Sequence, residues 1–224
     1  MYLITGSNRG IGLELCKQLL ARGEHIIAAC RASSGELDAL AASNDSCRIE
    51  TNIDVGQDSV GDMLRTRLAD VPALSCVINN AGVLFKENLD NLDFDSIRRQ
   101  FEVNTLGPLR VTHAVQDKLS TGAKVAIVTS RMGSIADNSS GGYYGYRSSK
   151  SAVNAVGMSL ANDLRERGIA VALLHPGYVQ TAMTGNNGDI SPETSAKGLL
   201  ERISDLTLAT TGTFWHVSGE QLPW

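Results

Sequence analysis

The sequence lacks the cysteine pairs of zinc proteins and the long hydrophobic runs of membrane proteins. Its four cysteines show no Cys-x-x-Cys spacing and its four histidines stand singly, so no metal-binding pattern emerges. No stretch reaches the roughly 18 apolar residues of a membrane span. The N-terminal MYLITG has neither the basic start nor the apolar stretch of a signal peptide. These absences predict a cytoplasmic protein with reduced cysteines and no metal site.

A cationic surface is missing as well. The formal net charge is −4 and basic runs are absent, which argues against nucleic acid or a membrane surface as a partner. No repeat, low-complexity tract or Pro/Gly/Ser-rich linker interrupts the 224 residues. A hydrophobic share of 42% is enough for a core. We therefore expect one domain, residues 1–224.

Short runs rich in valine and isoleucine alternate with segments of helical period. The expected strands are 2–5, 25–30, 47–50, 74–79, 124–129, 169–175 and 213–217. Ile11, Leu15 and Leu19 share one face of the first expected helix, and longer helices are expected near 93–119 and 144–167. This alternation predicts an α/β fold, a doubly wound parallel sheet of about seven strands with helices on both faces.

The first expected strand runs directly into a glycine-rich turn, Thr5-Gly6-Ser7-Asn8-Arg9-Gly10-Ile11-Gly12. Glycines suit such a turn because it needs unusual backbone angles and lets phosphates approach the main chain. The helix that follows offers free N–H groups and a positive dipole end to a pyrophosphate. No Lys-Ser/Thr follows the last glycine, so the turn is not an ATP-binding P-loop. The alternative is a tight turn that binds nothing.

The end of the second expected strand bears on which nicotinamide cofactor such a turn would hold. An acidic residue there holds the ribose 2′-hydroxyl, whereas an arginine accommodates a 2′-phosphate. The strand ends at Arg31, and Glu36 and Asp38 come later, on the next expected helix. Arg9 is placed to reach the same phosphate, and two guanidiniums favour a dianion. The pattern favours NADP(H) over NAD(H), with a solvated surface role for Arg31 as the alternative.

A tyrosine and a lysine open the helix near 144–167. Tyr146 and Lys150 are four residues apart and therefore share a helix face. A nearby cation lowers the pKa of a phenol and makes it usable in general acid–base catalysis. Tyr143 and Tyr144 have no lysine at this spacing. Taken alone, the pair also fits a half-exposed surface contact.

Further motifs fall where the expected strands end. Asn79-Asn80-Ala81-Gly82 follows the fourth strand, Ser130 ends the fifth and Pro176-Gly177 follows the sixth, while Asn104 lies inside a long helix. The carboxyl ends of parallel strands meet at one edge, where such sheets bind ligands. With these motifs in this order along nearly its whole length, the chain resembles the short-chain dehydrogenase/reductase family.

The resemblance implies a nicotinamide site. It assigns the following residues to the cofactor: Gly6, Asn8, Arg9, Gly10, Ile11, Gly12, Arg31, Asp54, Asn80, Ala81, Gly82, Lys150, Pro176, Gly177, Val179 and Thr181. Asp54 would contact the adenine, and Asn80 and Ala81 would pack near the adenosine ribose. Val179, by its backbone, and Thr181, by its hydroxyl, would lie beside the nicotinamide carboxamide.

The resemblance also implies a catalytic set and a reaction. Ser130 would orient a substrate carbonyl and Tyr146 would give or take the proton. Lys150 would bind the nicotinamide ribose and lower the pKa of Tyr146, and Asn104 would bulge its helix and hold a proton-relaying water. The expected activity is NADP(H)-dependent hydride transfer between cofactor and a carbonyl or alcohol. The alternative is an NADP(H)-binding signalling or sensor protein of the same fold.

Particular stretches resemble the C-factor and sniffer-type carbonyl reductases, a branch associated with NADPH. They are TGSNRGIG, ACR, GGYYGYRSSKSAVNA and the final GEQLPW. The distance from Ser130 to Tyr146 exceeds the usual family spacing, which predicts a longer loop at 131–145. The segment after the sixth strand is short, so a lid near 178–192 would be small.

The sequence also bears on the character of the substrate pocket and on association between copies of the chain. Pocket walls from 131–145, 83–92 and 178–192 predict a modestly apolar small-molecule site, with contributions from Met132, Ile135, Tyr143, Tyr178 and Met183. The family resemblance suggests a homodimer or homotetramer formed through the helices near 93–119 and 144–167. The alternative is that all their apolar residues face the sheet.

Overall fold

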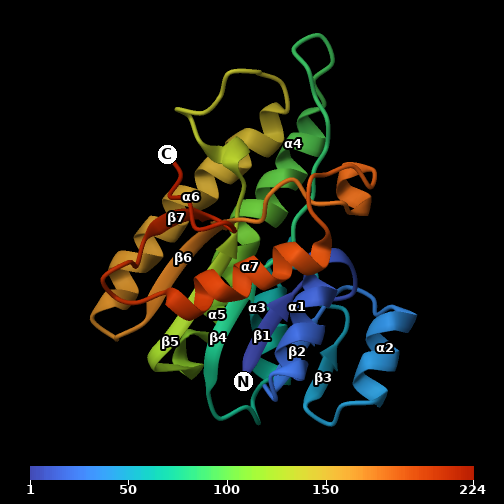
Figure 1. Ribbon diagram of the computed structural model, residues 1–224, viewed down its shortest axis with the longest axis vertical. Helices are drawn as coiled ribbons and strands as arrows, with labels where there is room; N and C mark the ends of the chain where they lie inside the picture. Colours follow the sequence, from blue (N-terminus) through green and yellow to red (C-terminus); the bar gives the residue numbers. More distant parts are fainter.

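Seven parallel strands form the centre of the molecule, in the order β3-β2-β1-β4-β5-β6-β7 (Figure 1). The computed structural model describes residues 1–224. The strands are Tyr2–Thr5 (β1), Ile26–Ala29 (β2), Cys47–Glu50 (β3), Leu74–Asn79 (β4), Leu119–Val128 (β5), Ala170–His175 (β6) and Thr213–His216 (β7). The predicted fold class and the number and order of the strands are confirmed, and the strand positions agree except that β5 begins at Leu119, five residues before its predicted start.

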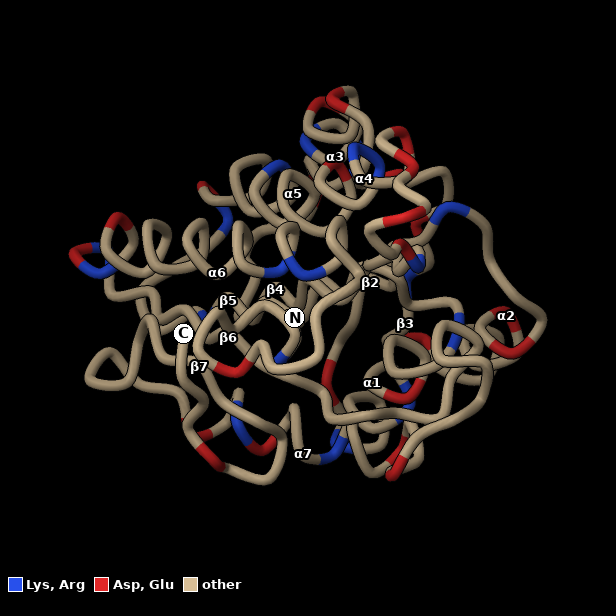
Figure 2. Tube along the Cα trace, turned by 90° about the horizontal axis from the view of Figure 1, so that it is seen from above, with Lys and Arg blue, Asp and Glu red and all other residues tan.

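The helices cover both faces of this sheet (Figure 2). They are Gly10–Ala21 (α1), Gly35–Ala42 (α2), Val60–Arg67 (α3), Phe94–Phe101 (α4), Gly107–Val115 (α5), Tyr144–Arg165 (α6) and Pro192–Asp205 (α7). Short helical turns are Glu102–Leu106 (η1, a π-helix), Gln116–Lys118 (η2), Arg131–Gly133 (η3) and Ala182–Thr184 (η4). From β1 the chain adds β2 and then β3 on one side of the sheet, and it then returns to place β4 on the other side of β1. This reversal creates a crevice beyond the ends of β1 and β4.

The core is divided into two layers by the sheet. On one face, side chains such as Leu15 of α1 and Leu199 of α7 pack against Ile4. On the other, Leu64 of α3 and Val153 of α6 join the cluster that holds Leu3. Neighbouring residues of β1 thus point to opposite faces and both are buried, as expected where helices cover both sides of a parallel sheet.

The predicted helix near 93–119 is divided by a π-turn. The N–H of Gly107 donates to the carbonyl of Glu102, five residues back, instead of four. Pro108 has no N–H to continue the α-helical pattern. Asn104 lies inside this turn, so the bulge that the family resemblance implied at Asn104 is present.

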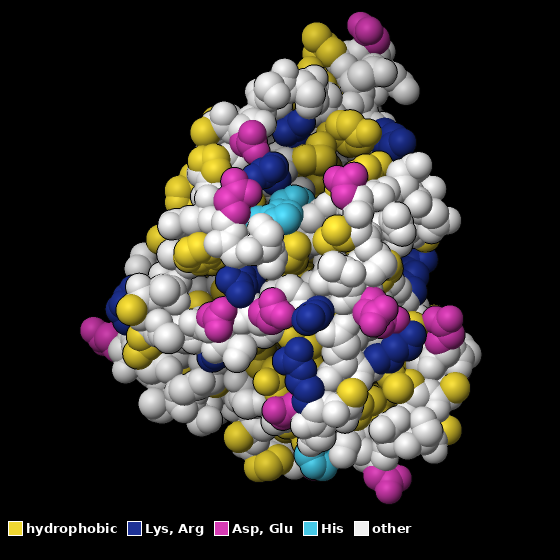
Figure 3. All heavy atoms as spheres, in the orientation of Figure 1, with side chains coloured by type: hydrophobic (Ala, Val, Ile, Leu, Met, Phe, Trp, Pro, Cys, Tyr) yellow, Lys and Arg dark blue, Asp and Glu magenta, His cyan; other side chains and the backbone are white.

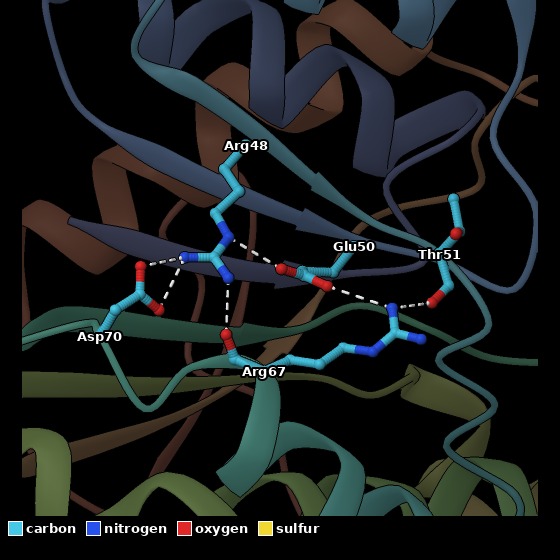
Figure 4. Close-up of polar contacts among 5 residues, drawn as sticks. All are labelled: Arg48, Glu50, Thr51, Arg67 and Asp70. Carbon is cyan, nitrogen blue, oxygen red and sulfur yellow. Dashed lines mark hydrogen bonds and ion pairs between the residues drawn. The ribbon is translucent and has the colours of Figure 1, made fainter.

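Ion pairs hold the edge strand β3 to α3 (Figure 4). Glu50 is 7% exposed and accepts hydrogen bonds from Arg48 at 2.8 Å and Arg67 at 3.1 Å. Arg48 also donates to both carboxylate oxygens of Asp70, and Arg67 donates to the carbonyl of Thr51. These contacts fix the chain that leaves β3 toward the crevice, and charged side chains discourage further strand pairing at this edge.

The cysteines form no disulfide bond. All four cysteines are free thiols, and Cys47 is the one that is not fully buried. Burial raises the pKa of the Cys76 thiol to about 12. None of the helices has the length and hydropathy needed to cross a bilayer.

Candidate active site

A cleft of about 500 Å³ lies at the carboxyl ends of the strands, a size usual for small-molecule sites. It brings together these predicted residues: Gly6, Asn8, Arg9, Gly10, Ile11, Gly12, Arg31, Asp54, Asn80, Ala81, Gly82, Tyr146, Lys150, Pro176 and Thr181. Four predicted residues do not line it: Asn104, Ser130, Gly177 and Val179. Val179 is buried and pairs with Ile190 in an isolated bridge.

The glycine turn has a shape that favours glycine. Gly6 and Gly10 have φ angles of +67° and +53°, in the left-handed region. A Cβ atom on Gly12 would lie 2.1 Å from the Gly6 carbonyl oxygen. The first turn of α1 contains no acidic residue and no side chain caps it. Its leading N–H groups, which have no carbonyl partner within the helix, are therefore available to an anion.

Asn80 joins the glycine turn to the end of β4. Its Nδ2 donates to the carbonyls of Thr5 at 3.0 Å and Gly6 at 3.1 Å. The Thr5 hydroxyl accepts from the N–H groups of Asn80 and Ala81, each at 3.1 Å. The two strand ends beside the chain reversal are thus fixed to each other, which holds the phosphate-binding turn against the floor of the cleft.

Arg9 and Arg31 have no carboxylate within ion-pair distance, and the nearby Asp54, whose pKa Arg31 helps to lower, is paired with Arg99. Both side chains are exposed and neither forms an ion pair. Glu36 and Asp38 lie on α2, as expected, and Asp38 accepts a hydrogen bond from Ser33 at 2.5 Å. The chain therefore presents two uncommitted guanidiniums at this end of the cleft.

Arg99 is a site residue that the sequence did not indicate. It lines the cleft from α4 and its Nη2 lies 3.0 Å from Oδ2 of Asp54. Burial alone would raise the pKa of the Asp54 carboxyl, but hydrogen bonds from the Gly56 N–H and from Arg99 hold it below its usual value. Asp54 is therefore anionic and fixed in place. Its partner lies 45 residues away in the sequence and has no local signature.

Tyr146 and Lys150 meet Ser130 at the other end of the cleft. Tyr146 is 8% exposed and Lys150 is 4% exposed. Burial raises the pKa of the Tyr146 phenol, and its hydrogen bond with Ser130 offsets part of that rise. Burial lowers the pKa of Lys150 to about 8.

The structure does not show the expected lowering of the Tyr146 pKa by Lys150. The lysine Nζ lies 5.7 Å from the centre of the tyrosine ring and donates instead to the Val128 carbonyl at 2.9 Å. Lys150 is not among the groups that lower the phenol pKa, and burial leaves that pKa above its ordinary value. The prediction of a lowered pKa was therefore wrong for the protein alone, because helix spacing places two groups on one face without revealing how deeply both are buried.

Asn104 connects the segment after β4 to α6. Its Oδ1 accepts from the Val83 N–H and its Nδ2 donates to the Val83 carbonyl, both at 2.9 Å. The same Nδ2 donates to the Ser149 hydroxyl at 3.1 Å, and that hydroxyl donates to the Tyr146 carbonyl at 2.8 Å. The π-turn therefore presents an amide whose hydrogen bonds support the helix turn that carries Tyr146.

Hydrophobic side chains are exposed around this end of the molecule. Figure 3 shows such side chains grouped on the upper part of the face, beyond the strands. The large exposed apolar residues of the expected pocket walls are Phe85, Leu89, Ile135, Tyr144, Tyr178 and Met183. Met183 and its neighbour Ala182 line the cleft itself. These side chains agree with the expected modestly apolar pocket walls.

The comparison with known proteins agrees with this geometry. The family model described as short chain dehydrogenase matches residues 1–190. The chain belongs to the short-chain dehydrogenase/reductase family. Such dehydrogenase/reductases act on small molecules, and this member is accordingly an oxidoreductase.

Individual relatives span the whole of this dehydrogenase/reductase. A 1-hydroxy-2-glutathionyl-2-methyl-3-butene dehydrogenase from Rhodococcus sp. is 43% identical over 99% of this chain and 98% of its own. The carbonyl reductase Sniffer of D. melanogaster superposes with a TM-score of 0.93 at 31% identity, covering 100% and 98% of the two chains. An NADPH-bound carbonyl reductase from chicken fatty liver gives 0.88 at 30% identity, with the same coverage. The predicted resemblance to sniffer-type reductases is confirmed.

Proposed function

We propose that this protein is an NADP(H)-dependent oxidoreductase that interconverts a carbonyl compound and its alcohol. The observation that carries the proposal is a cleft with a glycine turn at one end and, at the other, the buried Tyr146 and Lys150, with Ser130 hydrogen-bonded to Tyr146 behind the lining. One end suits a phosphate-bearing ligand and the other suits proton transfer. The relative whose structure holds NADPH supports the choice of ligand class.

The residues present fit a nicotinamide dinucleotide phosphate. Free N–H groups at the start of α1 suit the pyrophosphate, and the positive φ angles of Gly6 and Gly10 let it approach the backbone. Arg9 and Arg31 suit a 2′-phosphate because both are exposed and neither guanidinium is held in an ion pair. Asp54 and Asn80 would border the adenosine, while Pro176-Gly177 and Val179–Thr181 would border the nicotinamide. When bound, the cofactor supplies or accepts the hydride.

The chain's own residues supply orientation and the proton. In the reduction direction, the Ser130 and Tyr146 hydroxyls donate hydrogen bonds to the substrate carbonyl oxygen. These donors stabilise the negative charge that develops on this oxygen more than they stabilise the ground state. Tyr146 then gives its proton to that oxygen, and its raised pKa keeps the phenol in the protonated form at neutral pH until this step.

Lys150 and Asn104 support this proton transfer. With a pKa of about 8, the lysine ammonium exchanges protons near physiological pH and is placed to bind the nicotinamide ribose. We propose that a water beside the π-turn at Asn104 connects Lys150 to solvent. Desolvation of the whole cluster strengthens each of these hydrogen bonds.

The remaining expectations become proposals about the surroundings of the site. Residues 1–224 act as one domain, since strands from both ends of the chain share one sheet. The segment 178–192, which brings Thr181, Ala182 and Met183 to the cleft, acts as a small lid. Association of copies through α4, α5 and α6 stays a prediction.

The experiment that tests the proposal is a turnover assay of the purified protein. NADPH oxidation is followed with aldehydes and ketones, and NADP⁺ reduction with alcohols that include S-glutathionyl alcohols. The last class is included because of the name of the Rhodococcus relative. Fluorescence titrations with NADPH and NADH are run beside it. Turnover with tight NADPH binding supports the proposal.

The sensor alternative makes a different prediction in the same assays. A signalling protein of this fold would bind NADPH tightly and turn over none of these compounds. The joint presence of Ser130, Tyr146, Lys150 and Asn104 favours the enzyme, because a cofactor sensor does not need a buried acid–base set. Absence of binding to either nucleotide would contradict both hypotheses.

A further inference from the structure

The segment between β4 and α4 carries a buried carboxylate with no role in the reaction described above. Glu87 is 6% exposed, although Lys86 and Asn88 on either side of it are exposed. A carboxylate is costly to bury unless hydrogen bonds compensate for the lost water. The partners of Glu87 therefore indicate what it holds in place.

Glu87 connects α4 with the first turn of α6. Its Oε1 accepts hydrogen bonds from Gln100 Nε2 at 2.5 Å and from the Ser96 hydroxyl at 3.1 Å, both on α4. Its Oε2 accepts from the Gly145 N–H at 3.2 Å. Its backbone carbonyl accepts from the Tyr143 N–H at 2.8 Å. Side chain and main chain of one residue thus hold two positions at the start of α6.

The start of α6 has no other cap. Tyr143, at the cap position, has left-handed angles of φ 52° and ψ 42°, makes no side-chain cap hydrogen bond, and no acidic residue follows in the first turn. The leading N–H groups of a helix need an acceptor, and a negative charge near them is stabilising. Glu87 supplies both from a distant part of the chain. Tyr146 is the residue directly after the captured Gly145.

Gly145 shows how closely these elements fit. A Cβ atom at this position would lie 2.4 Å from Gln100 Nε2 and 3.0 Å from Oε1 of Glu87. There is no room for a side chain between the carboxylate and the helix. The glycine therefore lets the backbone N–H come within reach of Glu87.

The 83–87 segment is attached to the helix 96–104 at regular intervals. The Val83 N–H donates to the Asn104 side chain, and the Phe85 N–H donates to Gln100 Oε1 at 3.0 Å. The Glu87 carboxylate accepts hydrogen bonds from Ser96 and Gln100. Positions two residues apart in the segment thus bond to positions about four residues apart on the helix, and Glu87 is held at the far end.

We propose that Glu87 is a positioning residue for the proposed acid Tyr146, acting through the hydrogen bond to the Gly145 N–H. The inference rests on the function proposed above for Tyr146. Removal of the carboxylate leaves the first turn of α6 without its cap, so the phenol loses its fixed position beside Ser130. Small displacements of a reacting group reduce turnover strongly.

The test compares Glu87→Ala, Glu87→Gln and the control Asp90→Ala. Asp90 is an exposed carboxylate on the same segment. Amide hydrogen exchange over residues 143–150, NADPH affinity and kcat are measured well below each Tm. For Glu87→Ala we expect faster amide exchange in residues 143–150, a kcat reduced by about 10-fold, and unchanged NADPH affinity. Glu87→Gln should lie between, because an amide keeps one acceptor oxygen, and Asp90→Ala should match wild type.

Each outcome bears on a separate claim. A Glu87→Ala protein with a lower Tm but wild-type kcat and wild-type exchange in 143–150 overturns the inference, since Glu87 would then be merely structural. If wild type turns over no substrate while Glu87→Ala still loosens 143–150, the proposed function fails and the capping role stands. Should Glu87→Ala not fold, Glu87→Gln decides by the same readouts.

Discussion

Beside the glycine turn, the cleft presents backbone N–H groups and exposed guanidiniums; beside α6, it presents side chains withdrawn from water. Arg9 and Arg31 are exposed, whereas Tyr146 and Lys150 are each less than a tenth exposed. The core of the first half, residues 5–12, is continuous in the sequence, and Arg31 and Asn80 join it from the ends of neighbouring strands. The second is assembled from β5, α6 and the π-turn. The difference teaches that one half depends on local backbone shape, and the other on how distant elements pack.

The comparison is tested most strongly by Tyr146→Phe, which removes one hydroxyl from the buried half. General acid–base groups contribute roughly 10²- to 10⁴-fold to rate, so kcat should fall by about that factor. NADPH affinity should be unchanged, because the other half of the cleft is intact. Steady-state kinetics and fluorescence titration measure the two quantities.

Tyr144→Phe is the matched control for this substitution. Tyr144 lies on the same helix turn but is 42% exposed, so its loss should leave kcat unchanged. A Tyr146→Phe protein with wild-type turnover would remove the catalytic assignment.

The second test breaks the backbone half. Gly12→Ala places a Cβ atom 2.1 Å from the Gly6 carbonyl oxygen, so the turn must shift. We expect NADPH affinity to fall by about 100-fold or more, because several N–H contacts to the pyrophosphate are lost together. Gly35→Ala is the control, since a Cβ there meets nothing within 4 Å. Equal affinities of the two variants would contradict the role of the turn.

A smaller effect is expected from Arg31→Ala. Hydrogen bonds to charged groups contribute about 1.5–3 kcal/mol, which corresponds to a loss of roughly 10- to 100-fold in NADPH affinity. NADH has no 2′-phosphate, so its affinity should not change. The exposed Arg22 serves as control. If Arg31→Ala weakens both nucleotides equally, the preference for NADP(H) must have another origin.

The smallest effect is the gain in stability expected from Lys150→Met, a substitution that removes a proposed catalytic residue. The Lys150 pKa falls from 10.5 to about 8 on folding. Between these pH values the unfolded chain holds a proton that the folded chain lacks, so wild-type stability rises with pH. Below pH 8 the buried ammonium destabilises the fold in full. Lys150→Met should therefore raise Tm at pH 7 by about 5 °C.

This stability gain should shrink as pH rises from 8 toward 10.5, because the wild-type lysine becomes neutral in both states. Thermal melts of both proteins across this range measure it. A gain that is constant with pH would show that packing, and not charge burial, is its cause.

The same contrast explains how much the sequence predicted. The strands, the glycine turn and the Tyr146–Lys150 spacing are local patterns, and the structure has each of them where it was expected. β5 begins at Leu119 instead of 124, since its first residues include Ser120 and Thr121, which are exposed and show no apolar run. Local patterns thus predict the elements and their order.

Properties that arise from packing were not predicted. Arg99 and Glu87 appear in the sequence as ordinary charged residues, and their partners come from elsewhere in the chain. The direction of the pKa shift of Tyr146 depends on burial, which residue spacing does not reveal. The π-turn at Asn104 was implied by the family resemblance and by no pattern in the residues themselves.

The matched spacing of segment 83–87 and helix 96–104 has a consequence for evolutionary change. Deletion or insertion of one residue between Val83 and Glu87 would shift the carboxylate away from its partners on α4 and α6, because Val83 is fixed to Asn104 at the other end of the segment. Substitution of the exposed Lys86 leaves this register intact. We therefore expect the length of this segment to be more tightly constrained than its residue types.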